Sequence, residues 1–166
     1  MKILIFGLPG SGKSTLAKPL AEILSGTHVN ADNVRERYEG YDKSKWDFTP
    51  QGRMRQAQRM RHLADGVVMA GKIAVADFIC PTHESRELFN ADFTIYMDTI
   101  QESRFDDTNA IFERPDTSWG GVDYHVAKWF TDTHIQLVPI IERYMKMVST
   151  TQVGYSVWRL EQSENV

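Results

Sequence analysis

Residues 7–15 read Gly7-Leu8-Pro9-Gly10-Ser11-Gly12-Lys13-Ser14-Thr15, and this stretch decides the fold. It satisfies the pattern G-x-x-x-x-G-K-[ST] at every fixed position. A continuous apolar run, residues 2–6, precedes it, and residues 13–25 repeat leucine and isoleucine at helical spacing. We therefore expect a buried strand, a tight loop and a helix. Glycines let successive backbone N–H groups converge on one point without side-chain bulk, so the stretch predicts a loop that binds a chain of phosphate groups.

The same loop indicates the ligand. Its free backbone N–H groups and the positive end of the following helix dipole both attract an anion. Lys13 is placed to contact the β and γ phosphates of ATP, and the Ser14 hydroxyl to bind Mg²⁺. The alternative, a glycine-rich turn without a ligand, is disfavoured by the strand–loop–helix context. We expect ATP and Mg²⁺ as cofactors, with the nucleotide bound by Gly7, Pro9, Gly10, Ser11, Gly12, Lys13, Ser14 and Thr15.

The composition is that of an ordinary globular protein. The chain has 166 residues, 42% of them hydrophobic and 25% charged, and we expect one domain over residues 1–166. A single cysteine, Cys80, excludes an internal disulfide, and with the missing signal peptide it favours a cytoplasmic protein. No apolar run reaches the ~20 residues that a membrane span needs. The net charge of −3 argues against a nucleic-acid binder, although residues 1–62 carry an excess of basic side chains that suits an anionic ligand.

Strand and helix patterns alternate along the chain. Apolar runs predict strands at residues 2–6, 27–30, 72–80 and 93–98, and an alternating pattern predicts an edge strand at 152–159. Helical spacing predicts helices at 13–25, 31–38, 51–70, 83–90 and 132–148, with Pro19 and Pro139 expected to end or interrupt the first and the last. Residues 105–122 are rich in Asp, Thr, Gly and Pro and predict an irregular functional loop. The alternation predicts a three-layer α/β/α sandwich with a mostly parallel sheet, of the P-loop NTPase or nucleoside-kinase type.

Three further motifs resemble those of adenylyl-sulfate kinases, the family that phosphorylates the 3′-hydroxyl of adenosine 5′-phosphosulfate. Asp32-Asn33-Val34-Arg35 is similar to the family's Asp-Asn-Val-Arg, and Phe78-Ile79-Cys80-Pro81 to its Phe-Ile-Ser-Pro. Phe48-Thr49-Pro50-Gln51-Gly52-Arg53 resembles its Phe-Ser-x-x-x-Arg. The resemblance covers most of residues 1–115. The chain departs from it at Asn30, where the family has Asp, at Gln56, where it has Asn, and in the lid, of which only a shortened lid-like loop at 105–122 remains.

The resemblance and the residues together assign an acceptor site. Asp32 follows a predicted strand and is expected to accept the proton of the acceptor hydroxyl, with a helix N-cap as the alternative role. Arg35, Arg53 and Arg59 are candidates for holding an anionic group. The spacing of six residues means that Arg53 and Arg59 cannot both point into one pocket from an ideal helix. The resemblance implies that Phe48 and Phe78 sandwich the acceptor base, with core packing as the alternative for Phe78. The substrate-binding set is Asp32, Arg35, Phe48, Arg53, Phe78, Ile79, Cys80 and Pro81, and the catalytic set is Lys13, Asp32 and Arg35.

One acidic residue lies inside a strand predicted to be buried. A carboxylate there is costly unless it is paired or lies near a metal ion. We therefore assign Asp77, with Ser14, to Mg²⁺, and a buried salt bridge is the alternative. Arg104 and Arg114 flank the lid-like loop and are candidates for contact with the ATP phosphates.

The sequence thus predicts an ATP-dependent kinase that transfers the γ-phosphoryl group to a hydroxyl of a nucleotide-like small molecule, similar to adenylyl-sulfate kinase. Two alternatives stay open: a kinase of polynucleotide ends or modified nucleobases, and a non-catalytic nucleotide-binding module. A small-molecule partner is favoured over nucleic acid, no membrane partner is expected, and a homodimer is left open.

Overall fold

The computed structural model describes residues 1–118, 121–129 and 131–163, with side chains described up to residue 151. Five parallel strands form one sheet in the order β2-β3-β1-β4-β5. Their bounds are β1 Lys2–Gly7, β2 Thr27–Asn30, β3 Ala74–Asp77, β4 Phe93–Met97 and β5 Tyr124–Val126. The predicted parallel α/β sheet is therefore confirmed.

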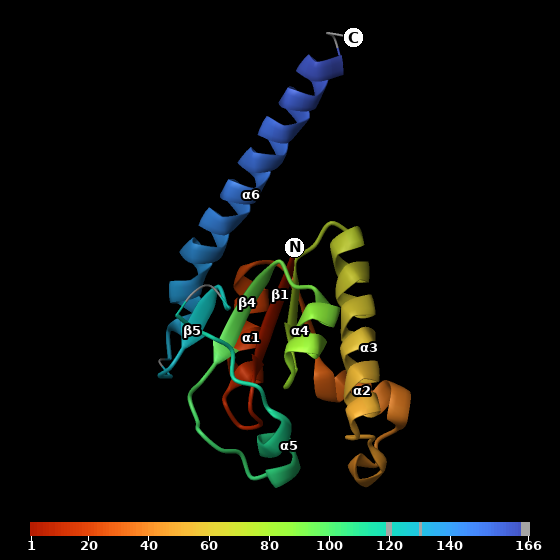
Figure 1. Ribbon diagram of the computed structural model, residues 1–166. Helices are drawn as coiled ribbons and strands as arrows, with labels where there is room; N and C mark the ends of the chain where they lie inside the picture. Colours follow the sequence, from red (N-terminus) through yellow and green to blue (C-terminus); the bar gives the residue numbers. More distant parts are fainter. Residues whose placement is uncertain (119–120, 130, 164–166) are drawn as a thin grey trace.

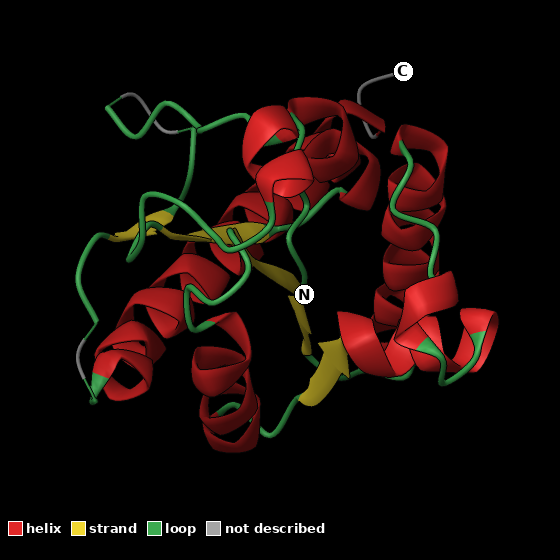
Figure 2. Cartoon of the chain, turned by 90° about the horizontal axis from the view of Figure 1, so that it is seen from below, coloured by secondary structure: helices red, strands yellow, loops and turns green. Residues whose placement is uncertain are grey.

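Helices cover both faces of this sheet (Figures 1 and 2). The helices are α1 Lys13–Ile23, α2 Ala31–Glu39, α3 Pro50–Met69, α4 His83–Phe89, α5 Asp106–Ile111 and α6 Thr133–Ser163, with a short 3₁₀ turn, η1, at Lys43–Lys45. Helices α1 and α6 pack on one face, and α3 and α4 pack on the other. This arrangement confirms the three-layer α/β/α sandwich.

The central strand shows why the sheet is buried on both sides. All six residues of β1 are buried. Ile3 and Ile5 belong to the core under α1 and α6, whereas Leu4 and Phe6 belong to the core under α3 and α4. Successive side chains of a strand point to opposite faces, so a strand with no polar alternation needs a helical layer on each side.

The C-terminal third differs from the sequence prediction. Residues 152–159, predicted as an edge strand, lie inside α6, and the strand beside β4 at that edge of the sheet is β5. β5 and α5 both fall near or within the segment predicted to be irregular, because three residues of strand and six of helix are too short to give a periodic signal. In addition, the strand predicted at 72–80 is limited to β3.

Two prolines do not end their helices. Helix α1 continues through Pro19 to Ile23, and α6 continues through Pro139. A proline removes one backbone donor and crowds the preceding turn. The buried neighbours Leu20 and Ile141 keep both helices on the core across these positions.

Because all strands are parallel, their carboxyl ends meet at one edge of the sheet, where open α/β sheets bind ligands. Gly7, Asn30 and Asp77 end β1, β2 and β3 at this edge. Helices α2 and α5 lie at the same end of the molecule, while α6 projects beyond the opposite end (Figure 1). No helix within the described residues is long and apolar enough to cross a membrane.

Candidate active site at the carboxyl edge of the sheet

The loop between β1 and α1 has the backbone geometry of an anion cradle. Gly10 and Gly12 adopt φ values of +84° and +92°, which favour glycine. At Gly7 a Cβ atom would lie 2.5 Å from the carbonyl oxygen of Met97, so the loop approaches β4 too closely for any side chain. Gly12 caps α1 without a side-chain hydrogen bond, which leaves the first N–H groups of the helix directed outward. These features fit a phosphate chain.

Two polar side chains of the cradle, Ser11 and Lys13, are placed to bind an anion. The Ser11 hydroxyl is buried and, within the described residues, has no hydrogen-bond partner. The Lys13 ammonium group donates to the carbonyl oxygen of Leu8 at 2.8 Å, so it folds back on its own loop. Burial lowers the pKa of Lys13 from 10.5 to about 8, against the opposing effect of the nearby Asp77 and Asp32 carboxylates. A bound phosphate would place negative charge beside this ammonium group and would thereby favour its protonated form.

A second cluster surrounds the Asp77 carboxylate beside the cradle. Ser14 donates a short hydrogen bond to Oδ2 of Asp77, and Nδ2 of Asn30 lies 3.1 Å from Oδ1. Nε2 of His28 lies 2.8 Å from the same Oδ1. Asp77 is only 2% exposed, so these three side chains take the place of water around its carboxylate. A hydroxyl and a carboxylate beside a phosphate cradle are a donor set that Mg²⁺ uses together with phosphate oxygens.

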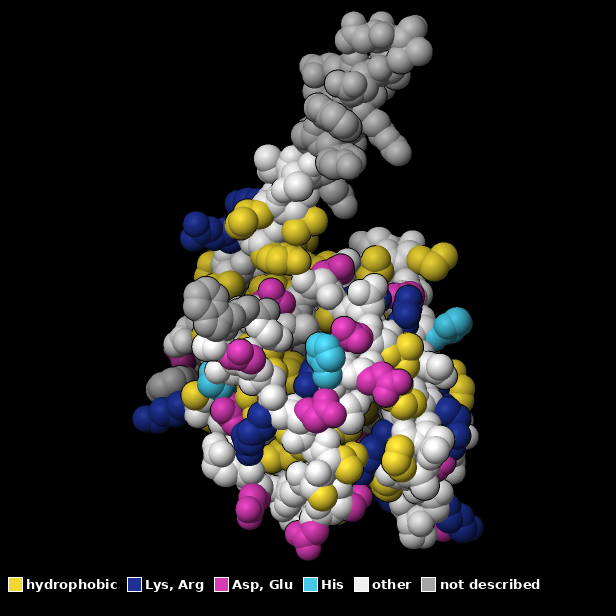
Figure 3. Space-filling model, viewed as in Figure 1, with side chains coloured by type: hydrophobic (Ala, Val, Ile, Leu, Met, Phe, Trp, Pro, Cys, Tyr) yellow, Lys and Arg dark blue, Asp and Glu magenta, His cyan; other side chains and the backbone are white. Residues whose placement is uncertain are grey.

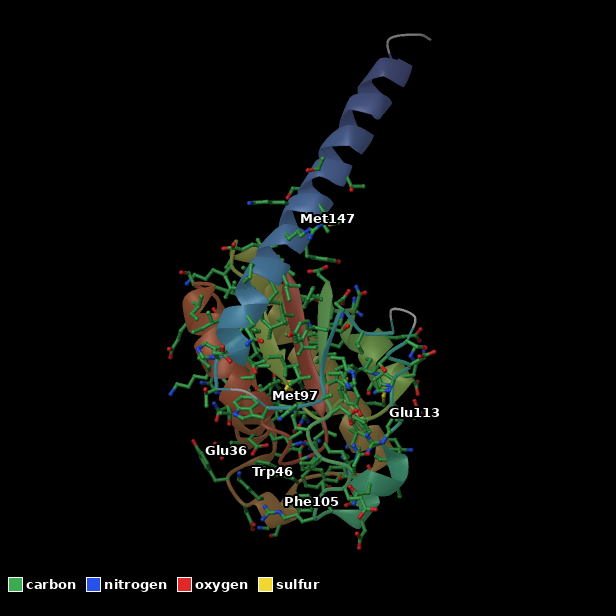
Figure 4. All side chains as sticks on the ribbon, turned by 90° about the vertical axis from the view of Figure 1, so that its left-hand side faces the viewer. Glu36, Trp46, Met97, Phe105, Glu113 and Met147 are labelled. Carbon is green, nitrogen blue, oxygen red and sulfur yellow. The ribbon has the colours of Figure 1, made fainter. Side chains whose placement is uncertain are left out.

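A cavity of about 490 Å³ opens next to the cradle. Pro9, Gly10, Lys13 and Ser14 form its wall on the nucleotide side. The lining also contains all eight residues predicted to bind the substrate, which together we call the acceptor wall: Asp32, Arg35, Phe48, Arg53, Phe78, Ile79, Cys80 and Pro81. Trp46 and Phe105, which also line the cavity, lie at the carboxyl end of the strands, while Met147 on α6 lies at the far end (Figure 4).

Asp32 lies in the first turn of α2, with 64% of its side chain exposed. Asn30 caps this helix by accepting a hydrogen bond from the Asn33 N–H at 3.1 Å, so the alternative reading of Asp32 as the N-cap is wrong. The Asp32 carboxylate instead faces the cavity and lies 3.3 Å from the Lys43 ammonium group. It is therefore placed as a group that can accept a proton from a bound hydroxyl.

Two buried arginines surround Phe48 on the acceptor wall. The guanidinium carbons of Arg35 and Arg53 lie 4.6 and 5.4 Å from the centre of the Phe48 ring. Nη1 of Arg35 donates to the carbonyl oxygen of Asp47 at 2.9 Å, and Nε of Arg53 donates to that of Phe48 at 2.9 Å. Burial lowers the pKa of both guanidinium groups, opposed for Arg35 by Glu39 and for Arg53 by Asp107. Two cations and an exposed ring thus converge on one part of the cavity.

The remaining predicted residues divide between site and core. Phe48 is 42% exposed, whereas Phe78 is 6% exposed and packs edge-on against Phe89 at 5.4 Å. Phe78 therefore lines the cavity from within the core, which agrees with the packing role considered for it. Its contact with an acceptor base stays a prediction. Cys80 is 1% exposed, and burial raises the pKa of its thiol to about 12.

Two arginines with suspected roles are engaged elsewhere. Nη1 of Arg59 donates to Glu39 at 2.6 Å, and Arg59 does not line the cavity. Nη1 of Arg114 donates to Asp98 at 2.8 Å and to the Tyr96 hydroxyl at 3.0 Å. Arg114 thus joins the lid-like segment to the end of β4, while Arg104 lines the cavity, and its contact with the ATP phosphates stays a prediction.

Sequence reasoning missed several residues that the fold brings to the site. His28 and Glu39 hold Asp77 and Arg35, and Lys43, Trp46, Gln56, Phe105, Asp107 and Thr108 line the cavity. The signal for His28 was its position two residues before Asn30, because alternate residues of a strand share one face. Nothing local marked Asp107 or Thr108, which reach the site only through the packing of α5.

The parallel α/β sheet, with a phosphate cradle after its central strand and a cavity joined to that cradle, has the P-loop nucleoside-kinase type of fold, which solved structures of an APS kinase, a shikimate kinase and a gluconokinase share. The family model described as AAA domain matches residues 3–96, and the chain belongs to this family. It resembles adenylyl-sulfate kinases in sequence. That of Shewanella baltica (strain OS195) is 37% identical over 94 residues, which is 54% of this chain and 44% of that protein. The chain thus spans less than half the length of the curated relatives that it matches.

Solved structures show the same fold. The Mycobacterium tuberculosis APS kinase CysC, in complex with AMPPNP and APS, has a TM-score of 0.67 at 18% identity, over 85% of this chain and 96% of that one. Shikimate kinase from Aquifex aeolicus has a TM-score of 0.62 at 15% identity, over 89% of this chain and 99% of that one.

Proposed function

We propose that this protein is an ATP-dependent kinase that transfers the γ-phosphoryl group to a hydroxyl of an anionic, nucleotide-like small molecule, as adenylyl-sulfate kinases do. One observation carries the proposal: a single cavity joins Lys13 and Ser14 of the phosphate cradle to Asp32, Arg35 and Phe48. Donor and acceptor sites that share one cavity allow direct transfer between them.

The chain's own groups would divide the work as follows. Backbone N–H groups of residues 7–15 bind the phosphates, and Lys13 exchanges its bond to Leu8 for the β and γ phosphate oxygens. Asp32 accepts the proton of the attacking hydroxyl. Ser14 and Asp77 would hold Mg²⁺, which when bound neutralises charge on the phosphate oxygens.

The acceptor chemistry follows from the acceptor wall. Arg35 and Arg53 supply guanidinium groups suited to phosphate, phosphosulfate or similar oxyanions. The exposed ring of Phe48 suits stacking on a planar base. A nucleotide offers both an anion and a base, so it fits this wall better than a neutral sugar or an apolar alcohol does.

A polynucleotide end is the second candidate, and the charges at the rim disfavour it. Three exposed cations near the cavity are each paired with a carboxylate: Lys43 with Asp32, Lys45 with Asp42, and Arg55 with Asp47. On the face drawn in Figure 3, basic and acidic side chains are interspersed. A strand of phosphates requires uncompensated positive charge along its path, so these pairs favour a small acceptor.

We further propose that residues 1–166 act as one kinase domain, with residues 105–122 as a short lid. The support is that α6 packs on α1 in the same core as the sheet, and that α5 is bonded to α3 through Arg53.

The direct test is transfer of labelled phosphate from ATP to a panel of acceptors: adenosine 5′-phosphosulfate, nucleoside monophosphates, nucleosides and oligonucleotide 5′ ends. We expect labelling of an anionic nucleotide, loss of turnover in Lys13→Ala, and loss of at least ~100-fold in Asp32→Asn. Gln58→Ala, at an exposed position of α3, is the matched control and should retain wild-type turnover. ATP binding without transfer to any acceptor would instead support a non-catalytic nucleotide-binding module.

A further inference from the structure

One side chain of the cluster around Asp77, that of His28, has no part in the proposed reaction. His28 lies on β2, two residues before Asn30, and its ring does not line the cavity. Its Nε2 atom lies 2.8 Å from Oδ1 of Asp77, and 24% of its side chain is exposed. His28 therefore contacts the Asp77 carboxylate from behind, on the side away from the nucleotide cradle.

The two oxygens of Asp77 have different neighbours. Oδ1 accepts from His28 and, at 3.1 Å, from Nδ2 of Asn30. Oδ2 accepts from the Ser14 hydroxyl and lies 3.3 Å from the same Asn30 nitrogen. His28 thus holds the rear oxygen of the carboxylate and leaves the front oxygen directed at Ser14.

Strand geometry makes this arrangement specific. Asn30 is the register partner of Asp77, and His28 is that of Val75, so all four side chains share one face of the sheet. Asn30 also caps α2, because its Oδ1 accepts a hydrogen bond from the Asn33 N–H group. Within the described residues, the side-chain hydrogen bond of His28 is to this carboxylate.

We propose that His28 is a positioning residue: its Nε2–H group donates to Oδ1 of Asp77 and fixes the carboxylate so that Oδ2 faces Ser14 and the bound Mg²⁺–nucleotide. The inference rests on the proposed function, since it assumes that Ser14 and Asp77 face the metal. A hydrogen bond to the rear oxygen fixes the rotation of a carboxylate. The acceptor requires the tautomer that carries the proton on Nε2.

The test is the Mg²⁺ dependence of ADP affinity, measured by isothermal titration calorimetry on the wild-type chain and on His28→Ala, His28→Leu and His28→Gln. Mg²⁺ should raise the affinity for ADP, and the midpoint is the Mg²⁺ concentration that gives half of this increase. For His28→Ala we expect this midpoint to rise by about 10–100-fold. ADP affinity in EDTA should stay unchanged, because the cradle itself is intact. His28→Gln keeps an N–H donor and should recover most of the loss, and His28→Leu keeps the volume without the donor and should not.

His62, an exposed histidine on α3, gives the matched control, and His62→Ala should behave as wild type. In turnover assays kcat at fixed Mg²⁺ should fall in His28→Ala while KM for the acceptor stays constant. Should His28→Ala not fold, as judged by circular dichroism, the comparison of His28→Leu with His28→Gln decides.

The possible failures are distinct. If ADP affinity of the wild-type chain does not depend on Mg²⁺, the metal assignment of the proposed function is wrong. If the wild-type chain shows the dependence and His28→Ala and His28→Leu share its midpoint, His28 has no positioning role and the inference is overturned.

Discussion

Nη2 of Arg53 lies 2.9 Å from Oδ2 of Asp107, and this ion pair joins α3, on which Arg53 lies, to α5 of the lid-like segment. The same nitrogen bonds the Thr108 hydroxyl at 3.0 Å. Arg53 is buried, whereas 65% of the Asp107 side chain is exposed. The guanidinium group that we assign to the acceptor anion is therefore already shared with a carboxylate of the lid.

This shared arginine leads to a first prediction. In Asp107→Asn the acceptor anion no longer competes with a carboxylate for Arg53, so we expect KM for the acceptor to fall by about 2–10-fold. Thermal stability should change little, because the lost pair is exposed on one side. Steady-state kinetics measures the effect. Asp106→Asn, at the neighbouring position of α5, is the control, and an equal fall in KM there would contradict the assignment.

The two phenylalanines of the acceptor site should respond differently to truncation. Phe78→Ala removes a ring that is 6% exposed, and we expect a loss of about 3–5 kcal/mol in the free energy of unfolding. Phe48→Ala removes a ring that is 42% exposed, so stability should fall much less while KM for the acceptor rises roughly 10-fold through lost stacking. Urea denaturation and kinetics together separate the two. A stable Phe78→Ala variant would show that this ring is not part of the core.

Lys13 should destabilise the protein in the absence of nucleotide. Burial lowers its pKa in the folded state to about 8, whereas the ordinary pKa of a lysine, which applies to the unfolded chain, is 10.5. Between these values the unfolded state binds more protons, so the wild-type free energy of unfolding rises as the pH increases from about 8 to 10.5. At pH 7 we expect Lys13→Met to be more stable than wild type by about 1–2 kcal/mol.

Chemical denaturation at pH 7, 9 and 10.5 measures this difference, which should shrink with pH. Lys18→Met, at an exposed position of the same helix, should show no such trend. A difference for Lys13→Met that is constant with pH would show that the effect is packing and not charge.

Cys80 should be inert in the native protein although its residue lines the cavity. Burial raises the pKa of its thiol from 9.0 to about 12, so the reactive thiolate fraction at pH 8 falls about 1,000-fold. Alkylation by iodoacetamide at pH 8, followed by mass spectrometry, should be slow in buffer and fast in urea. Rapid modification of the folded protein would mean that the thiol is open to solvent.

Local pattern was sufficient for the phosphate cradle. Strand, glycine-rich loop and helix lie within residues 2–25, and the roles of Gly10, Gly12 and Lys13 depend on backbone geometry that those residues themselves impose. Part of the cavity lining was also predictable, because Asp32 follows the predicted strand at 27–30 and parallel strands end at one edge of a sheet.

The later part of the chain was less predictable. β5 has three residues, and its pairing with β4 depends on the sheet edge that β4 offers, not on its own pattern. The alternation at 152–159 was too short to outweigh the continuing backbone hydrogen bonds of α6. Segments with weak intrinsic preference take the structure that their neighbours allow.

The sequence by itself determined the cradle and the order of strands and helices through residue 98. Only the tertiary structure decided the partners of the charged side chains. His28 and Asp77 are 49 residues apart, and Arg53 and Asp107 are 54 apart. Their contacts depend on strand register and on the docking of α5. A periodic pattern fixes the face of an element, but it carries no information about which distant element packs against that face.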